Sequence, residues 1–233
     1  AIYKPVSHTT PTQAHLVYKA PTFDSSPGWS GKVAGVRKLD CTGNTESYNA
    51  AGPGTVVPLS SLMKGAPGEF WACGRENVNS IAGDEIEIYK GSWTTSNDVA
   101  WTTHTVLNLP VFAAAPVIAD VNIAFGPARL KGGISAVAHT SNITSQNRKV
   151  PVLYGTSDGG ATWEGPIILD PRNYSCLTAS LGANPDPGLT GQSSLVVDAY
   201  GNPHMLVVAG ASDNNHELDY TKFSPARLAR GIK

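Results

Sequence analysis

Eight side chains suited to ligand recognition or proton transfer fall in the long polar segments of this 233-residue sequence. An arginine fork can bind a carboxylate through two parallel hydrogen bonds, and a tyrosine ring can stack on an apolar sugar face. A carboxyl group or an imidazole can act as acid or base when its surroundings tune its pKa. The candidate site residues are Arg75, Glu76, His139, Arg148, Arg172, Tyr174, Asp213 and His216. For any single one of them, a solvated loop residue is the alternative interpretation.

Short apolar runs separated by turn residues surround these candidates. The chain has 24 glycines and 17 prolines, and only 15% of its residues are charged. Val, Ile and Thr gather in short runs, which is typical of many strands joined by turns. Helical periodicity is nearly absent, and residues 224–231 (SPARLARG) alone read as a short helix, strand or tail. The sequence therefore predicts an all-β protein.

One polar turn sequence recurs along the chain. TSDGGATW at 156–163 and TFDSSPGW at 22–29 share Thr, Asp and Trp at their first, third and eighth positions, and TSNDVAW at 95–101 is a looser copy. Each copy follows an aliphatic run that ends in tyrosine. The tyrosines of these runs and of a fourth one, Tyr18, Tyr89, Tyr154 and Tyr220, are spaced by 71, 65 and 66 residues. This spacing predicts a repeat of roughly 65–70 residues, present about four times.

Each repeat can be read as four antiparallel strands, A to D, with the recurring turn between C and D. Strands are predicted at 116–125, at 132–139 and at 151–155, and a hairpin turns at 200–202. Four-stranded units repeated around an axis make a β-propeller. We predict a single domain over residues 1–233, with units of roughly 1–40, 41–110, 111–170 and 171–233. A closed four-bladed ring and part of a larger six- or seven-bladed propeller both stay open.

The turn pattern S/T-x-D-x-G-x-T-W resembles the Asp-box, or BNR repeat, of sialidase-like propellers. The matching residues are Thr156, Asp158, Gly160, Thr162 and Trp163, and in part Thr22, Asp24 and Trp29. The stretch DAYGNPHMLVV at 198–208 also looks like the A–B hairpin of such propellers. A carboxylate followed by a glycine turn can accept backbone N–H groups, so we expect Asp158 to be structural rather than catalytic. In the resembling family the Asp-box lies on the face opposite the active site.

Alternating strand directions put A–B and C–D turns at one end of each unit and B–C and D–A loops at the other. The loops predicted at the second end span residues 41–54, 74–85, 139–149, 171–188 and 211–217. All eight candidates lie in these loops, and the cysteines Cys41, Cys73 and Cys176 lie in or beside them. Long loops at one end of a rigid scaffold are where function usually resides.

The resemblance also implies what a catalytic site would contain. A sialidase site uses three arginines, a Tyr–Glu nucleophile pair and an acidic Asp, and an early Phe/Tyr-Arg-Ile-Pro motif supplies the first arginine. That motif is missing here, since GVRKL (35–39) and PARL (127–130) lack its flanks. A polysaccharide lyase on such a propeller would use His, Tyr and Arg, types that His139, Tyr174 and Arg148 provide.

We predict a glycan-recognising module, extracellular or cell-surface, that binds a carbohydrate or glycoconjugate through the B–C/D–A loops. The first alternative is a carbohydrate-active enzyme, either a sialidase-like glycosidase or a polysaccharide lyase. The second is a structural or protein-interaction propeller that another polypeptide completes within a larger assembly.

Charge, hydropathy and the cysteine pattern decide which classes of partner and site are expected. The net charge is −1 without a basic block, so nucleic acid is not expected. No apolar run approaches the about 20 residues of a membrane helix. No cofactor or metal is expected, although a structural Ca²⁺ in the loop 184–188 stays open. Sequons at Asn142 and Asn173 favour secretion, and the cysteines form no CxxC pair, which leaves reduced thiols or one disulfide.

Overall fold

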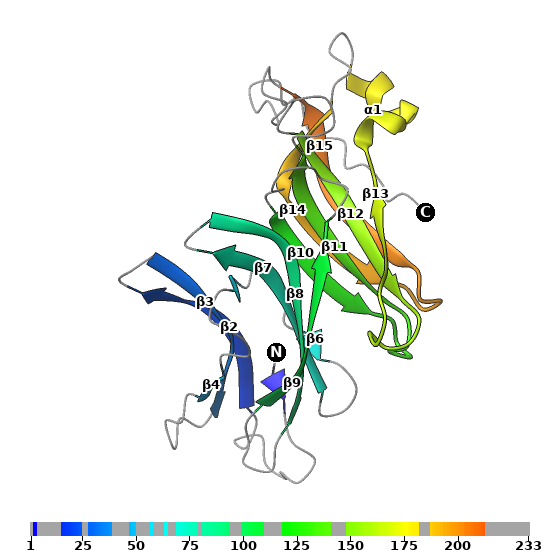
Figure 1. Ribbon diagram of the computed structural model, residues 1–233. Helices are drawn as coiled ribbons and strands as arrows, with labels where there is room; N and C mark the ends of the chain where they lie inside the picture. The colour runs from blue at the N-terminus through cyan, green and yellow to red at the C-terminus, as the bar shows by residue number, and fades with distance from the viewer. Residues whose placement is uncertain are drawn as a thin grey trace. The chain divides into compact units, whose positions relative to one another are not determined.

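The computed structural model consists almost entirely of antiparallel β-sheet (Figure 1). It describes residues 2–3, 15–24, 28–38, 47–49, 56–57, 63–64, 69–78, 81–93, 99–109, 118–140, 148–181 and 187–212. Side chains are described for residues 69–75, 85–92, 102–109, 118–138, 148–179, 181 and 187–212. Helix in this part of the chain is confined to three short turns within 171–181, so the all-β class is confirmed. The chain divides into two compact units, Ala1–Leu107 and Asn108–Lys233.

The first sheet of the N-terminal unit has the strand order β1-β2-β3-β4 with every pair antiparallel. Its strands are β1 (Ile2–Tyr3), β2 (His15–Asp24), β3 (Gly28–Lys38) and β4 (Ser47–Asn49). The turn sequence at 22–29 joins β2 to β3, the second and third strands, whereas we predicted the third and fourth. The difference arises because β4 pairs back onto β3 from a polar segment without apolar alternation.

The second sheet of this unit is built around the long hairpin of β7 and β8. Its strands are β5 (Val56–Val57), β6 (Met63–Lys64), β7 (Glu69–Val78), β8 (Ile81–Trp93) and β9 (Val99–Asn108). The strand order is β5-β7-β8-β9, and β6 also pairs with β7. The loop predicted over 74–85 is wrong, because β7 and β8 run through most of it. Ladder pairing, including Arg75 opposite Ile86, holds these polar residues extended despite their low strand propensity.

The C-terminal unit contains a four-stranded sheet and a separate hairpin. The sheet has the order β10-β11-β12-β13, with β10 (Ile118–Phe125), β11 (Gly132–Thr140), β12 (Arg148–Thr156) and β13 (Glu164–Ile168). The hairpin is β14 (Pro187–Val197) and β15 (Pro203–Ala211). Between β13 and β14 lie η2 (Pro171–Asn173), α1 (Ser175–Thr178) and η3 (Ala179–Leu181), which the sequence did not predict. The strands predicted at 116–125, 132–139 and 151–155 and the hairpin at 200–202 are confirmed.

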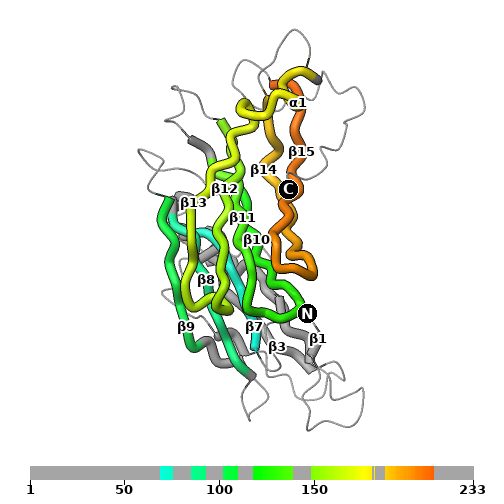
Figure 2. The backbone as a smooth tube through the Cα atoms, turned by 90° about the vertical axis from the view of Figure 1, so that its right-hand side faces the viewer, coloured from blue at the N-terminus to red at the C-terminus, as the bar shows by residue number. Residues whose placement is uncertain are grey.

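One face of this sheet packs on the hairpin, which lies beside β10 in Figures 1 and 2. Strand β11 is buried along most of its length, and Ile134, Ala136 and Val137 are 0% exposed. Gly133 comes so close to the hairpin that an added Cβ would lie 3.1 Å from Pro203 Cβ. Glycine at this position therefore allows the sheet and the hairpin to approach closely.

A polar contact joins the first strands of the sheet and the hairpin, β10 and β14. The Ser193 backbone N–H donates to Asp120 Oδ2 at 2.8 Å, and Asn122 Nδ2 donates to the Ser193 carbonyl at 3.0 Å. The Ser193 hydroxyl adds a bond to the same carboxylate oxygen at 3.0 Å. These directional bonds fix the position of the hairpin along the sheet.

The connections of the C-terminal unit gather at two ends (Figure 2). The turns after β10, β12 and β14 lie together at one end. They contact one another, because the Gly159 N–H donates to the Leu130 carbonyl at 2.7 Å and Lys131 Nζ to the Tyr200 carbonyl at 3.4 Å. The helical segment 171–181 lies at the other end. The turns after β10 and β14 correspond to A–B turns and the turn after β12 to a C–D turn. The prediction that A–B and C–D turns share one end is therefore confirmed within this unit.

The described part of the chain sets limits on two further predictions. No helix in it is long and apolar enough to cross a membrane. None of its sheets closes into a barrel, and no propeller is detected in it, so the propeller and its repeat boundaries stay predictions.

Candidate functional site

The predicted site residues are distributed unevenly over the structure. Arg148, Arg172 and Tyr174 lie at the end of the C-terminal unit that carries the helical segment. Outside the described residues are Cys41, Asn142, Asp213, His216 and most of the loop 184–188.

Like Arg148, which begins β12, three other candidates lie in strands rather than in the predicted loops. Arg75 and Glu76 are in β7, and His139 is in β11. Only the side chain of Arg75 is among the described ones; it is half-buried, and this burial lowers its pKa. His139 pairs with Lys149 near the end of the β11–β12 ladder, next to the pair of Thr140 and Arg148.

The turn at 156–163 is organised around the carboxylate of Asp158. Its Oδ1 accepts the Thr162 N–H at 2.9 Å and the Thr156 hydroxyl at 2.8 Å. Its Oδ2 accepts the Thr162 hydroxyl at 2.6 Å. These donors, Thr162 first, hold the pKa of Asp158 at about 2, below the usual 3.8. The carboxylate therefore accepts hydrogen bonds from residues of its own turn and holds the turn closed.

Two glycines let the backbone close this turn. Gly159 and Gly160 have φ of 74° and 84°, a region that side chains disfavour. The Gly160 N–H donates to the Thr156 hydroxyl at 3.0 Å. After the turn, the Trp163 ring meets the Phe125 ring of β10 edge-on, with centroids 6.1 Å apart. This pairing anchors the turn to the first strand of the same sheet.

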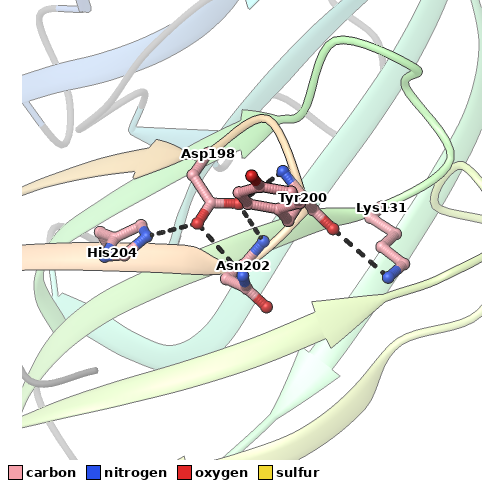
Figure 3. A network of polar contacts seen from close by, with 5 residues as sticks. All are labelled: Lys131, Asp198, Tyr200, Asn202 and His204. Atoms are coloured by element: carbon pink, nitrogen blue, oxygen red, sulfur yellow. Dashed lines mark hydrogen bonds and ion pairs between the residues drawn. The ribbon is translucent and has the colours of Figure 1, made fainter.

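The hairpin turn between β14 and β15 uses a second aspartate in the same way (Figure 3). Asp198 Oδ1 accepts the N–H groups of Tyr200 and Asn202, each at 2.9 Å. Its Oδ2 accepts Asn202 Nδ2 at 3.1 Å and contacts His204 Nε2 at 3.0 Å. These contacts, His204 first, hold the pKa of Asp198 well below its usual range. In both turns the residue four positions on supplies a backbone and a side-chain donor.

The opposite end of the unit brings two predicted site residues, Arg148 and Arg172, to the carboxylate of Asp170. Asp170 precedes η2 as its N-cap, and its Oδ1 accepts the Arg172 N–H at 3.0 Å. The Arg172 guanidinium returns to the same carboxylate, with Nε 3.0 Å from both oxygens and Nη2 2.5 Å from Oδ2. The Arg172 side chain is still 32% exposed, whereas that of Asp170 is 12% exposed.

Arg148 adds a second guanidinium to this cluster. It begins β12, is only 3% exposed, and its charge acts on Asp170. Burial alone would raise the pKa of Asp170, but the Arg172 bonds and the charges of both arginines lower it overall. The charges of two arginines, Arg148 and Arg172, thus act on the carboxylate of Asp170 at this end. An excess of positive charge on a partly exposed surface suits an anionic ligand.

Tyr174 and the second sequon lie directly beside the cluster. Tyr174 caps α1 and is half-buried, while Asn173 and Ser175 of the sequon are exposed. Cys176 is exposed and Cys73 is buried in β7, and neither of these two described cysteines forms a disulfide. Attachment of a glycan at Asn173 would therefore be sterically open.

The N-terminal unit holds a cluster that sequence reasoning missed. Glu87 in β8 is almost fully buried, and its Oε2 contacts His104 Nε2 of β9. The His104 ring stacks on Tyr89 with centroids 4.6 Å apart. Burial first, and then Glu87, raises the pKa of Tyr89. Because Glu87 and Tyr89 have little contact with solvent, we interpret the cluster as a packing contact of the sheet.

The described residues contain no group of three or more His, Cys, Asp or Glu side chains placed to hold a metal ion. No family model matches the sequence, and no curated protein matches it either. The site is therefore defined by its own geometry.

Proposed function

We propose that this chain is a sialidase-like Asp-box propeller module that binds an acidic carbohydrate through the end marked by Arg148 and Arg172. The proposal rests on the contrast between the two ends of the C-terminal unit. One end holds short turns, two of which are closed on their own aspartates, Asp158 and Asp198. The other carries Arg148 and Arg172, whose charges act on Asp170, and the half-buried Tyr174 that follows them in the chain.

The strand order supports the propeller part of this proposal. Three successive sheets are antiparallel and have sequential strands at their centre, as blades have. In the C-terminal unit, the first strand of the hairpin packs beside the first strand of the preceding sheet. Adjacent blades of a propeller meet in this way, with their first strands nearest the axis.

The arginines support the choice of an acidic ligand. Asp170 fixes the plane of Arg172, so less side-chain entropy is lost when a ligand carboxylate binds there. Tyr174 is half-buried at the same end and supplies an aromatic ring for a sugar. The exposed sequon at Asn173 supports the extracellular or cell-surface location that we propose with this function.

A panel of sialosides, uronic-acid oligosaccharides and neutral glycans, with wild-type protein, tests the proposal. We expect binding of an acidic member, weakened about tenfold or more in Arg172→Lys, which keeps the charge but loses the fork. Lys131→Ala changes a cation at the opposite end and should bind like wild type. Product analysis of the bound glycan reports any turnover. Failure to bind every acidic member, or equal affinity of Arg172→Lys with an unchanged melting temperature, would reject the proposal.

A further inference from the structure

The dipeptide Asp158–Gly159 is chemically distinctive in this chain. It is the only Asp-Gly in the sequence, and Asn-Gly does not occur. Glycine leaves the following backbone nitrogen unhindered, because it has no side chain. Among the aspartates of this chain, Asp158 is therefore the one most prone to attack by the following backbone nitrogen.

The reaction at such a dipeptide needs no partner except water. The Gly159 nitrogen would attack the neutral Asp158 carboxyl carbon, forming a C–N bond. The carboxyl OH would leave with the amide proton as water, which gives a five-membered succinimide. Water then adds to either ring carbonyl and breaks one C–N bond. The product is aspartate again, or isoaspartate with the backbone routed through the side chain.

The folded turn opposes this reaction at both reacting groups. Both carboxylate oxygens accept bonds from Thr162, which holds the carboxyl group across the turn. The Gly159 N–H donates to the Leu130 carbonyl at 2.7 Å, so the nitrogen is fixed on the neighbouring turn. Attack requires both sets of bonds to break, which amounts to a local opening.

The protonation state opposes the reaction as well. The attacked species is the neutral acid, whereas the Thr162 and Thr156 donors keep the pKa of Asp158 at about 2 instead of 3.8. Well above both values, this lowers the neutral fraction about sixtyfold.

We propose that Asp158–Gly159 is a latent spontaneous-modification site of this protein, a succinimide and isoaspartate site that the Thr162 contacts keep unreactive while the turn is closed. Isoaspartate shortens the side chain by one carbon and lengthens the backbone by one. Its carboxylate can then no longer reach both donors of Thr162, so a modified turn would stay open. The proposal stands on the turn geometry alone and is independent of any carbohydrate ligand.

The Asp198 turn provides a matched control within the same chain. It has the same two-donor arrangement from Asn202, but Ala199 follows the aspartate. Loosening that turn with Asn202→Ala should therefore produce little isoaspartate at Asp198.

The experiment ages wild type, Thr162→Val and Asn202→Ala at neutral and mildly acidic pH, together with a synthetic peptide of residues 154–164. Peptide mapping by mass spectrometry measures succinimide, and an isoaspartate-specific methyltransferase measures isoaspartate. We expect wild type to react at Asp158 at least about tenfold more slowly than the peptide. Thr162→Val should react there about tenfold faster than wild type, because it loses one hydrogen bond to a charged group.

Wild-type protein that reacts at the peptide rate would overturn the proposal. So would a Thr162→Val protein in which the Gly159 amide exchanges faster but Asp158 reacts no faster. If Thr162→Val does not fold, the rate at Asp158 is compared instead between folded wild type and wild type unfolded in urea. Equal rates at Asp158 in those two states would overturn the proposal, and a slower rate in the folded state supports it.

Discussion

Replacement of Gly133 by alanine tests how the four-stranded sheet packs on the hairpin. An added Cβ would lie 3.1 Å from Pro203 Cβ, 3.4 Å from the Tyr154 carbonyl oxygen and 3.7 Å from Leu195 Cδ2. The first distance is shorter than ordinary van der Waals contact, so the hairpin must move by a few tenths of an ångström or the sheet must distort. The three contacts come from both β12 and the hairpin, which leaves little freedom to relax.

The chain offers a control that isolates this contact. Gly155 pairs with Gly133 across the β11–β12 ladder, but its added Cβ would meet nothing within 4 Å. Removing a strand glycine stabilises by about 0.5–1 kcal/mol through the backbone entropy of the unfolded chain. Overpacking costs about 1–3 kcal/mol. We therefore expect Gly133→Ala to be destabilised by about 1–2 kcal/mol and Gly155→Ala to be neutral or more stable.

Urea unfolding followed by tryptophan fluorescence and circular dichroism measures both variants. A change of midpoint at constant slope reports stability. Equal midpoints for the two variants would refute the reasoning, because the hairpin would then not lie where Gly133 places it. A parallel loss in Gly155→Ala would point to strand flexibility rather than to contact with Pro203.

Three further predictions follow from single contacts. Tyr154→Phe removes the hydroxyl that donates to the Asn108 carbonyl at 2.7 Å, and loss of this hydrogen bond should lower the free energy of unfolding by about 1–2 kcal/mol in urea titration. Gly201→Ala should cost about 1–2 kcal/mol in the same assay, because φ there is 87° and the new Cβ would collide with the Lys131 side chain; an unchanged midpoint would contradict this. The pKa of Asp158 is lower in the folded than in the unfolded protein, so its carboxylate stabilises the fold above pH 3.8. This contribution should disappear as the pH falls through about 2. Urea midpoints measured across this range should therefore depend less on pH in Asp158→Asn than in wild type.

Strands with apolar alternation and glycine turns could be predicted from the sequence. GGISAVAH at 132–139 reads as a strand and is one, and the TSDGGATW turn closes on Asp158 as expected from its glycines. Polar residues in strands could not be predicted. Arg75 looks like a loop residue because strand propensity ignores the pairing that ladder bonds with β8 impose.

The candidate site was predicted only in part. Arg148 and Arg172 were singled out by residue type, but their meeting at Asp170 depends on how β12 and η2 are brought together. Asp170 itself had a signal, since Asp before Pro is a common start for a helical turn. The Glu87–His104 contact had none, because cross-strand register determines it.

Hydrogen–deuterium exchange with and without the best-bound acidic glycan tests most directly where this protein binds its ligand. We predict protection of amides in residues 148–150 and 170–178, at the end that holds Arg148 and Arg172. The turns at 126–131, 157–163 and 198–202 should exchange as in the free protein. Protection confined to those turns, with none at 148–150 or 170–178, would contradict the proposed location of the site.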